Sequence, residues 1–307
     1  MVTPCHRGTV SVDFPFPSTA SPVAASAPPS SPPFVVAVAI TKGGTGKTTT
    51  SAALAVELAS GGDPVVLIDV DTQGQAAHAL GVVPADRGPG LAGVLVGTAT
   101  MADALRPARP ATDASGPVWI LPGSAALAGE AGKMASDMAA GMLAVRDAAL
   151  AAAAEAGARI VVIDTPPGWG PLSLSSLAAA DVVLSPLPPH ALVIEALATF
   201  DRHLATVQRT RAAFGGAALP RLAFVLPTMV APRGTAPALA LDAIREWAAA
   251  HRDGPVVLSP IARSVRVEES PVVGLSVTEH APEHAASEAY RAAAQAVREA
   301  ADAFAAV

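Results

Sequence analysis

The sequence predicts an α/β fold: a doubly wound, mostly parallel sheet of seven to eight strands with helices on both faces. Seven short apolar runs rich in β-branched residues each end in a turn signal. Longer stretches rich in Ala and Leu, with helical spacing, separate most of these runs. Strands that are apolar on both faces belong in a covered sheet, and strands that alternate with helices build a parallel one.

The expected strands occupy residues 34–40, 64–70, 118–121, 159–164, 181–187, 221–226 and 255–259. The expected helices occupy residues 47–60, 135–156, 191–213, 236–251 and 285–305. Ligands of such a sheet bind outside the carboxyl ends of its strands. The loops that follow the strands are therefore the place to look for a site.

No linker divides residues 34–307, which we expect to form a single domain. Residues 1–33 are rich in Pro, Ser and Ala, a composition that predicts a disordered tail. The one cysteine, Cys5, excludes a disulfide framework and favours a reducing, cytoplasmic compartment. No apolar run has the length and bounds of a membrane span.

The strongest motif is KGGTGKTT, which follows the first expected strand and opens the first expected helix. That context is the one a phosphate-binding loop requires, because glycines let successive backbone N–H groups surround phosphate oxygens. Lys47 is placed to reach the β- and γ-phosphates of a nucleotide, and Thr48 to hold Mg²⁺. The predicted nucleotide-binding residues of this loop are Lys42, Gly43, Gly44, Thr45, Gly46, Lys47, Thr48 and Thr49.

Two further strands end in acidic residues. Asp164 closes the run RIVVID before Thr165, in a Walker B arrangement that holds a carboxylate at the sheet edge for Mg²⁺. Asp69 and Asp71 follow the second expected strand on one face, beside the phosphate loop.

The standard Walker A motif has glycine where this chain has Thr41, and the loop carries a second lysine, Lys42. KGGTGKT with this entrance lysine resembles the deviant Walker A motif of the ParA/MinD family. DVDTQG (69–74), VVIDTPPG (161–168), LPPHALVIEAL (187–197), LPTMVAPR (226–233) and ARSVRVEESPVVGLSV (262–277) resemble successive ParA segments, in the right order.

The resemblance implies an ATP- and Mg²⁺-dependent ATPase that dimerises on ATP. Lys42 would then cross to the nucleotide of the facing subunit and act in catalysis, as an arginine finger does, together with Lys47. The resemblance also assigns Asp71 to the attacking water and Asp69 to the surroundings of the metal. It places the base against Thr228, Met229, Pro260 and Ile261, although Ala262 stands where many ParA proteins have proline.

Residues 202–267 hold nine arginines and three acidic residues, although the whole chain has a net charge of −6. Such asymmetry indicates an anionic partner. The resemblance favours Arg233, Arg263 and Arg266 as non-specific DNA contacts. It also implies a ParB-like centromere-binding partner and a nucleoid-associated location. The last residues, VREAADAFAAV, lack the basic amphipathic character of a membrane-targeting helix.

Two alternatives stay open at this point. A ParA-like ATPase can position a protein cluster or microcompartment in place of DNA. A metabolic ligase or kinase, of the dethiobiotin-synthetase kind, can share the same core, but it would need a substrate pocket and no Lys42.

Overall fold

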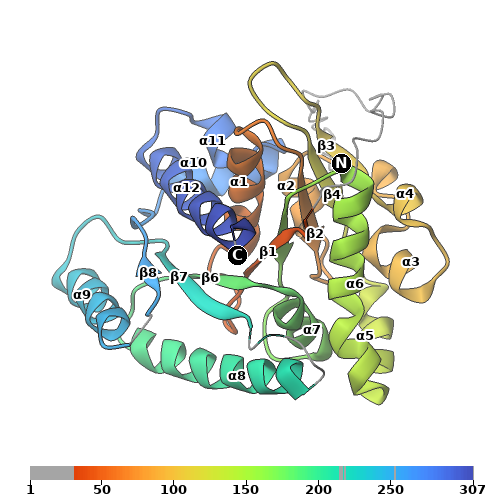
Figure 1. Cartoon of the computed structure of the whole chain (residues 1–307). Helices are drawn as coiled ribbons and strands as arrows, with labels where there is room; N and C mark the ends of the chain where they lie inside the picture. Colours follow the sequence, from red (N-terminus) through yellow and green to blue (C-terminus); the bar gives the residue numbers. More distant parts are fainter. Residues whose placement is uncertain (1–30, 214–216, 218, 252–253, 307) are drawn as a thin grey trace, which may run out of the picture.

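In the computed structural model the described residues are 31–213, 217, 219–251 and 254–306. They contain one eight-stranded sheet in the order β3-β4-β2-β5-β1-β6-β7-β8 (Figure 1). Every neighbouring pair is parallel except β3 with β4. The strands are β1 (Phe34–Val38), β2 (Val65–Asp69), β3 (Arg106–Arg109), β4 (Val118–Leu121), β5 (Ile160–Asp164), β6 (Val182–Leu187), β7 (Arg221–Pro227) and β8 (Val256–Val257). The predicted α/β fold is confirmed.

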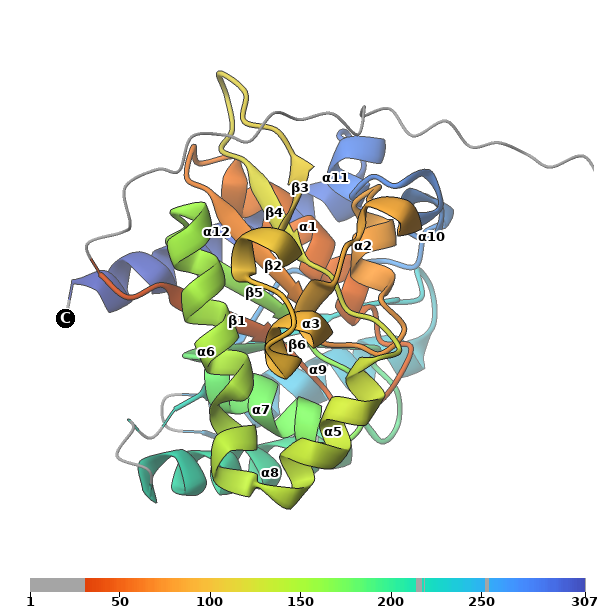
Figure 2. The same cartoon turned by 90° about the vertical axis from the view of Figure 1, so that its right-hand side faces the viewer.

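Helices cover both faces of this sheet (Figures 1 and 2). The α-helices are α1 (Lys47–Ala59), α2 (Gln75–Ala79), α3 (Gly90–Val96), α4 (Met101–Ala104), α5 (Leu127–Ser136), α6 (Met138–Ala156), α7 (Pro171–Ala179), α8 (Val193–Ala213), α9 (Thr235–Ala249), α10 (Val265–Glu269), α11 (Val277–His280) and α12 (Ala285–Ala305). Two 3₁₀ turns, η1 (Pro84–Asp86) and η2 (Ser270–Val273), complete the described elements.

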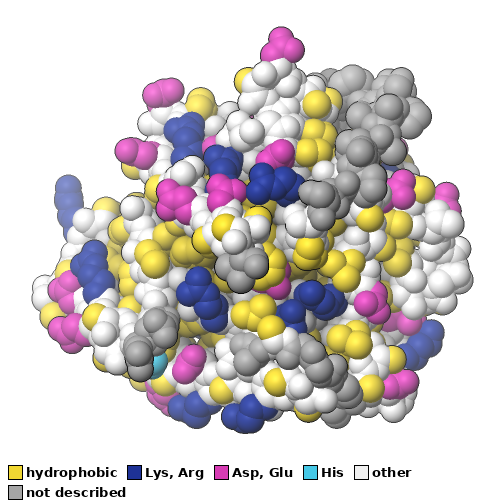
Figure 3. All heavy atoms as spheres, viewed as in Figure 1, with side chains coloured by type: hydrophobic (Ala, Val, Ile, Leu, Met, Phe, Trp, Pro, Cys, Tyr) yellow, Lys and Arg dark blue, Asp and Glu magenta, His cyan; other side chains and the backbone are white. Residues whose placement is uncertain are grey.

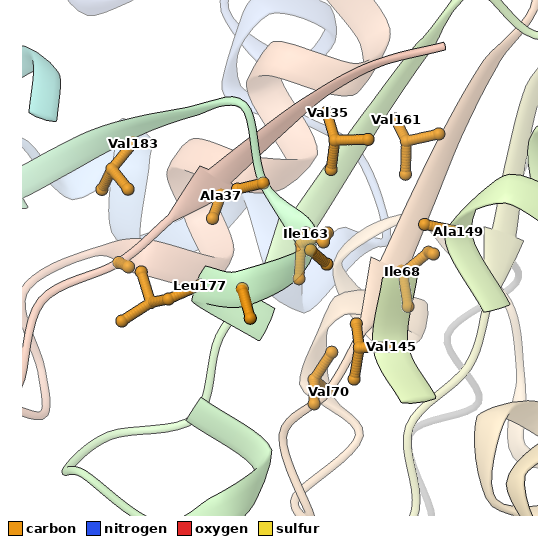
Figure 4. Close-up of a cluster of buried hydrophobic side chains, with 14 of the residues drawn as sticks. Val35, Ala37, Ile68, Val70, Val145, Ala149, Val161, Ile163, Leu177 and Val183 are labelled. Carbon is orange, nitrogen blue, oxygen red and sulfur yellow. The ribbon is translucent and has the colours of Figure 1, made fainter. Parts of the chain in front are cut away.

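Alternate residues of each strand enter two separate cores. On β1, Val35 and Ala37 pack with α6, α7 and α8, whereas Phe34, Val36 and Val38 pack with α1, α2 and α12. Figure 4 shows the first of these cores, with side chains of the strands meeting those of α6 and α7. The two-residue period of a strand thus explains why its sequence is apolar throughout.

Several elements differ from the expected ones. The edge strand β3 was not predicted, because Arg106 and Pro107 hide its pattern; proline is tolerated at a sheet edge. The expected helix 135–156 is interrupted at Asp137, whose side chain accepts the N–H of Ala140 and starts α6. The last strand is shorter than predicted, and most of the predicted tail, residues 1–30, lies outside the described residues. No helix in the described ranges is both long and apolar enough to cross a membrane.

Arg109 joins the sheet edge to the segment around α11. Its guanidinium donates to both carboxylate oxygens of Glu279, at 2.6 and 2.9 Å, and to the carbonyls of Leu80 and Gly274. Both charged groups are largely removed from water. Breaking such a pair leaves an uncompensated carboxylate and two carbonyls without these bonds.

We therefore expect Arg109→Met to lower the free energy of unfolding by about 3–5 kcal/mol, measured by urea denaturation. Arg159→Met is the matched control, since Arg159 pairs with Asp63 and Asp302 at the exposed surface. That variant should lose at most about 1 kcal/mol. Equal losses in the two variants would contradict the role given to Arg109.

Candidate nucleotide-binding site

The glycine-rich loop lies between β1 and α1, at the carboxyl end of the sheet. Gly44 and Gly46 have φ angles of 67° and 90°, a left-handed conformation that glycine adopts without strain. Two neighbouring segments tie the loop down. The hydroxyl of Thr228, after β7, donates to the carbonyl of Thr45 at 2.8 Å, and the N–H of Gly168, after β5, donates to the carbonyl of Thr41 at 2.9 Å.

Lys47 begins α1 inside this loop and is buried. Its ammonium donates to the carbonyl of Lys42 at 3.4 Å, a long bond that engages one of three donors. Burial lowers the pKa of Lys47, while the charges of Asp164 and Asp71 act in the opposite direction. A buried ammonium at the start of a helix that follows a glycine-rich loop has the character of a phosphate-binding site.

Asp164 ends β5 and is paired in register with Val38 on β1 and with Asp69 on β2. The hydroxyl of Ser51 donates to its Oδ1 at 3.1 Å, and the nearby hydroxyl of Thr48 acts with Ser51 to lower its pKa. Its Oδ2 is buried without a hydrogen-bond partner among the described residues. Burial raises the pKa of Asp164 to about 6, against the hydrogen bonds of Thr48 and Ser51. An orphaned carboxylate oxygen beside a threonine hydroxyl fits a Mg²⁺ ligand set.

Asp69 and Asp71 have different surroundings. Both oxygens of Asp69 accept backbone N–H groups, from Asp71 at 3.0 Å and from Ala76 at 2.9 Å, so this buried side chain fixes the loop into α2. Burial and the nearby charge of Asp164 raise the pKa of Asp69 well above its ordinary range. Asp71 is partly exposed and accepts the N–H of Gln73, so its carboxylate is open to a water molecule.

A pocket of about 280 Å³ opens beside the loop. Gly46 and Thr49 form its phosphate-loop side, and Thr228, Met229 and Ile261 form the side contributed by the loops after β7 and β8. The predicted Pro260 is exposed and lies outside this lining. A mostly apolar pocket adjoining a phosphate site has the character that a nucleotide base requires.

Two residues that line the pocket were not predicted from the sequence. They are Val267 of α10 and Tyr290 of α12, on the side contributed by these two helices. The hydroxyl of Tyr290 lies 3.4 Å from that of Thr50, and burial raises the pKa of this phenol to about 12. No local motif marks these residues, because α12 reaches the pocket only through the tertiary fold.

Lys42 is exposed at the mouth of the loop. Its Nζ lies 3.5 Å from Nε2 of His190, in the loop after β6. His190 was not predicted as a site residue, although it lies in the ParA-like segment 187–197 and at the carboxyl end of a central strand.

The three arginines predicted to contact DNA have different surroundings. Arg263 lines the pocket and lies 3.4 Å from Glu268, and Arg266 lies 3.3 Å from Glu269. Arg233 is exposed in the loop before α9. On the face seen in Figure 3, basic and acidic side chains are interspersed. Among the described residues on that face, no patch of a single sign is visible.

Comparison with known proteins agrees with this geometry. A family profile described as an AAA domain matches residues 34–214. The chromosome partitioning protein ParA of Caulobacter vibrioides is 34% identical over 262 residues, which cover 83% of this chain and 90% of that protein. The chromosome-partitioning ATPase Soj of Thermus thermophilus is 33% identical, over 85% of this chain and 94% of that protein.

The chain belongs to the ParA/Soj family of partition ATPases. The resemblance inferred from the deviant loop is thereby confirmed.

Solved structures share the fold of this ParA/Soj family member. The ATP complex of a Cyanothece McdA variant superposes with a TM-score of 0.70 at 21% identity, covering 87% of this chain and 97% of the other. A structure named cobyrinic acid a,c-diamide synthase from Mycobacterium smegmatis, with bound ADP and magnesium, superposes with a TM-score of 0.67. It is 29% identical and covers 86% and 94% of the two chains. These relatives hold a nucleotide, and the second holds Mg²⁺ as well.

The burial of Asp164 predicts a conflict between binding and stability. Folding raises the pKa of this carboxyl above the pKa that it has in the unfolded chain. Keeping the carboxylate ionised therefore lowers the stability of the fold at high pH, and this cost vanishes once the pH lies below the pKa of both states. We expect Asp164→Asn to raise the free energy of unfolding at pH 8, without nucleotide or Mg²⁺, by on the order of 2 kcal/mol. The gain should shrink as the pH falls from 7 towards 4.

Urea denaturation at several pH values measures this effect. Asp113→Asn, at an exposed turn, is the control and should change stability by less than about 0.5 kcal/mol. A destabilised Asp164→Asn protein at pH 8 would show that the ionised carboxylate is favoured by the fold.

Proposed function

We propose that this chain is an ATP-dependent partition switch of the cytoplasm. It binds ATP with Mg²⁺, dimerises across the two nucleotides, and in that state binds nucleoid DNA without sequence preference. A ParB-like partner on the plasmid or chromosome stimulates hydrolysis, which releases the dimer. The observation that carries this proposal is the second lysine of the loop, Lys42, which is exposed while Lys47 is buried within the loop.

The nucleotide site is assigned from the contacts described above. Lys47 and the backbone amides of residues 43–49 hold the phosphates, with the base in the pocket beside Thr228, Met229 and Ile261. Thr48 and Asp164 hold Mg²⁺, which supplies charge neutralisation on the phosphate oxygens when bound. Asp71 orients the attacking water. Asp69 holds the loop between β2 and α2, which carries Asp71, in place by accepting two backbone N–H groups.

The direction of Lys42 supports the proposed dimer. Its carbonyl faces its own loop, where it accepts from Lys47, and its side chain extends outward to the loop after β6. An exposed ammonium in this position can stabilise charge that develops on a nucleotide held by a facing subunit.

We expect the two loop lysines to have separable roles. Lys47→Ala should abolish ATP binding, because it removes the buried ammonium. Lys42→Ala should retain ATP binding within a few-fold but lose dimerisation and lower hydrolysis by about 10³-fold or more. Equilibrium binding of a fluorescent ATP analogue, sedimentation and phosphate release measure the three properties.

The third lysine is the matched control. Lys133 is exposed on α5 and pairs with Glu130, so Lys133→Ala should leave all three properties unchanged. An equal loss of ATP affinity in the Lys42 and Lys47 variants would argue against the crossing role.

DNA binding is assigned to Arg233, Arg263 and Arg266. The two ion pairs of Arg263 and Arg266 are at the exposed surface, where such pairs contribute only about 0–1 kcal/mol. Phosphate can therefore replace these carboxylates at small cost. Arg263 also lines the nucleotide pocket, so Arg233 gives the cleanest test.

We expect Arg233→Ala to weaken ATP-dependent binding to DNA of arbitrary sequence. Because each subunit then neutralises one phosphate fewer, the slope of log affinity against log salt should fall in magnitude by about 2 for the dimer. ATP binding should be unchanged. Arg202→Ala, which removes an exposed charge on α8, controls for net charge. The assignment fails if both variants lose DNA affinity equally.

One comparison favours a second candidate, since the structure named as a cobyrinic acid a,c-diamide synthase is 29% identical over most of both chains. A metabolic ligase needs neither Lys42 nor DNA. Binding of ATP-loaded protein to arbitrary DNA therefore separates the two functions. The likeness to McdA, at 21% identity, shows the fold alone and does not favour one cargo over another.

A further inference from the structure

The loop after β6 places a second hydrogen-bond donor beside Lys42. His190 follows Pro188 and Pro189 at the carboxyl end of β6, the strand next to β1. Its Nε2 lies 3.5 Å from the Nζ of Lys42. Both side chains reach the surface at the mouth of the phosphate loop.

The ring of His190 has a defined tautomer. The backbone N–H of Leu192 donates to its Nδ1 at 3.2 Å, so that nitrogen is an acceptor. The proton of the neutral ring then lies on Nε2. Nε2 is therefore a donor, and the Lys42 ammonium is a donor too, so these two atoms cannot bond to each other. Two donors therefore lie 3.5 Å apart, and within the described part of the chain no acceptor is shared by both of them.

The position of the ring is built into the fold. The carbonyl of His190 accepts the N–H of Val193, the first residue of α8, at 2.9 Å. Val193 is anchored in the core with 1% of its surface exposed. The two prolines before His190 restrict the other side of the turn. The ring is thus held in place at its attachment and at Nδ1, and Nε2 is presented outward.

We propose that His190 and Lys42 together bind a phosphate oxygen of the ATP held by the facing subunit. An anionic oxygen is the acceptor that satisfies an ammonium and an imidazole N–H at once. We assign the oxygen to the facing subunit because the side chain of Lys42 extends to the loop after β6, whereas its carbonyl accepts from Lys47. This inference rests on the proposed ATP-dependent dimer, to which it adds His190 as a phosphate-binding residue acting across the interface.

The first test compares His190→Ala with His190→Gln. Loss of a hydrogen bond to a charged group should weaken ATP-dependent dimerisation and hydrolysis by about 10- to 100-fold in the alanine variant. Glutamine keeps an N–H donor and should recover part of the loss. Affinity of the monomer for ATP should stay within about twofold, since the residue serves the other subunit's nucleotide. His251→Ala is the control, because that histidine lies just beyond α9 and its ring bonds to the carbonyl of Trp247.

The second test uses mixed dimers without DNA. One subunit carries Asp71→Ala with Lys42 and His190 intact, and the other carries His190→Ala with Asp71 intact. If His190 acts across the interface, mixing should restore hydrolysis above that of either parent. An impaired His190→Ala protein that mixing fails to rescue would place the residue on its own nucleotide and overturn the inference.

The failures of the two proposals can be told apart. A wild-type chain that stays monomeric with ATP overturns the dimeric switch, and this inference with it. A wild-type chain that dimerises, with a His190→Ala variant that dimerises and hydrolyses equally well, overturns this inference alone.

Discussion

The buried charges at the carboxyl edge of the central strands are the constraint on which the site depends. Lys47, Asp69 and Asp164 are all at most 7% exposed, at the edge of central strands β1, β2 and β5 that are otherwise apolar. Burying charges costs free energy unless partners compensate it. Asp69 obtains two backbone N–H bonds, whereas Asp164 keeps an oxygen without a partner among the described residues and Lys47 has one long bond. The incomplete compensation is what a nucleotide and its metal ion would remedy.

The topology then brings three loops onto the phosphate loop. β1 lies between β5 and β6, so the segments after these strands flank it, and the segment after β7 follows. Gly168 bonds to Thr41, Thr228 bonds to Thr45, and His190 approaches Lys42. Each contact comes from a different crossover of the parallel sheet. A change at the phosphates can therefore reach several helices through short, direct connections.

The sequence pattern predicted those site residues that lie within a recognisable motif. The first strand, the glycines of the loop and Lys47 are contiguous in sequence, and Asp164 ends another apolar run. Because the ends of parallel strands meet at one edge of the sheet, the phosphate loop and Asp164 lie close together. Tyr290 and His190 escaped prediction because their nearness to the loop is a property of tertiary structure, across 240 residues and 148 residues respectively. The short β3 escaped because it pairs only with β4, at the sheet edge, and its residues are partly polar. Asp69 was placed correctly at the edge, but only the structure shows that backbone amides occupy both of its oxygens.

One of the three arginines proposed to contact DNA, Arg263, lines the pocket proposed to hold the base. Arg263, Val267 and Glu268 all line that pocket, and Glu268 is also the ion-pair partner of Arg263. A ligand that fills the pocket therefore contacts both members of an exposed pair whose own stability is small. If base binding displaces Glu268 from Arg263, the guanidinium becomes available to an external phosphate without any larger rearrangement. Coupling between nucleotide binding and DNA binding then requires only that Arg263 exchanges Glu268 for a phosphate. The coupling free energy cannot exceed the small free energy of the Arg263–Glu268 ion pair that is broken.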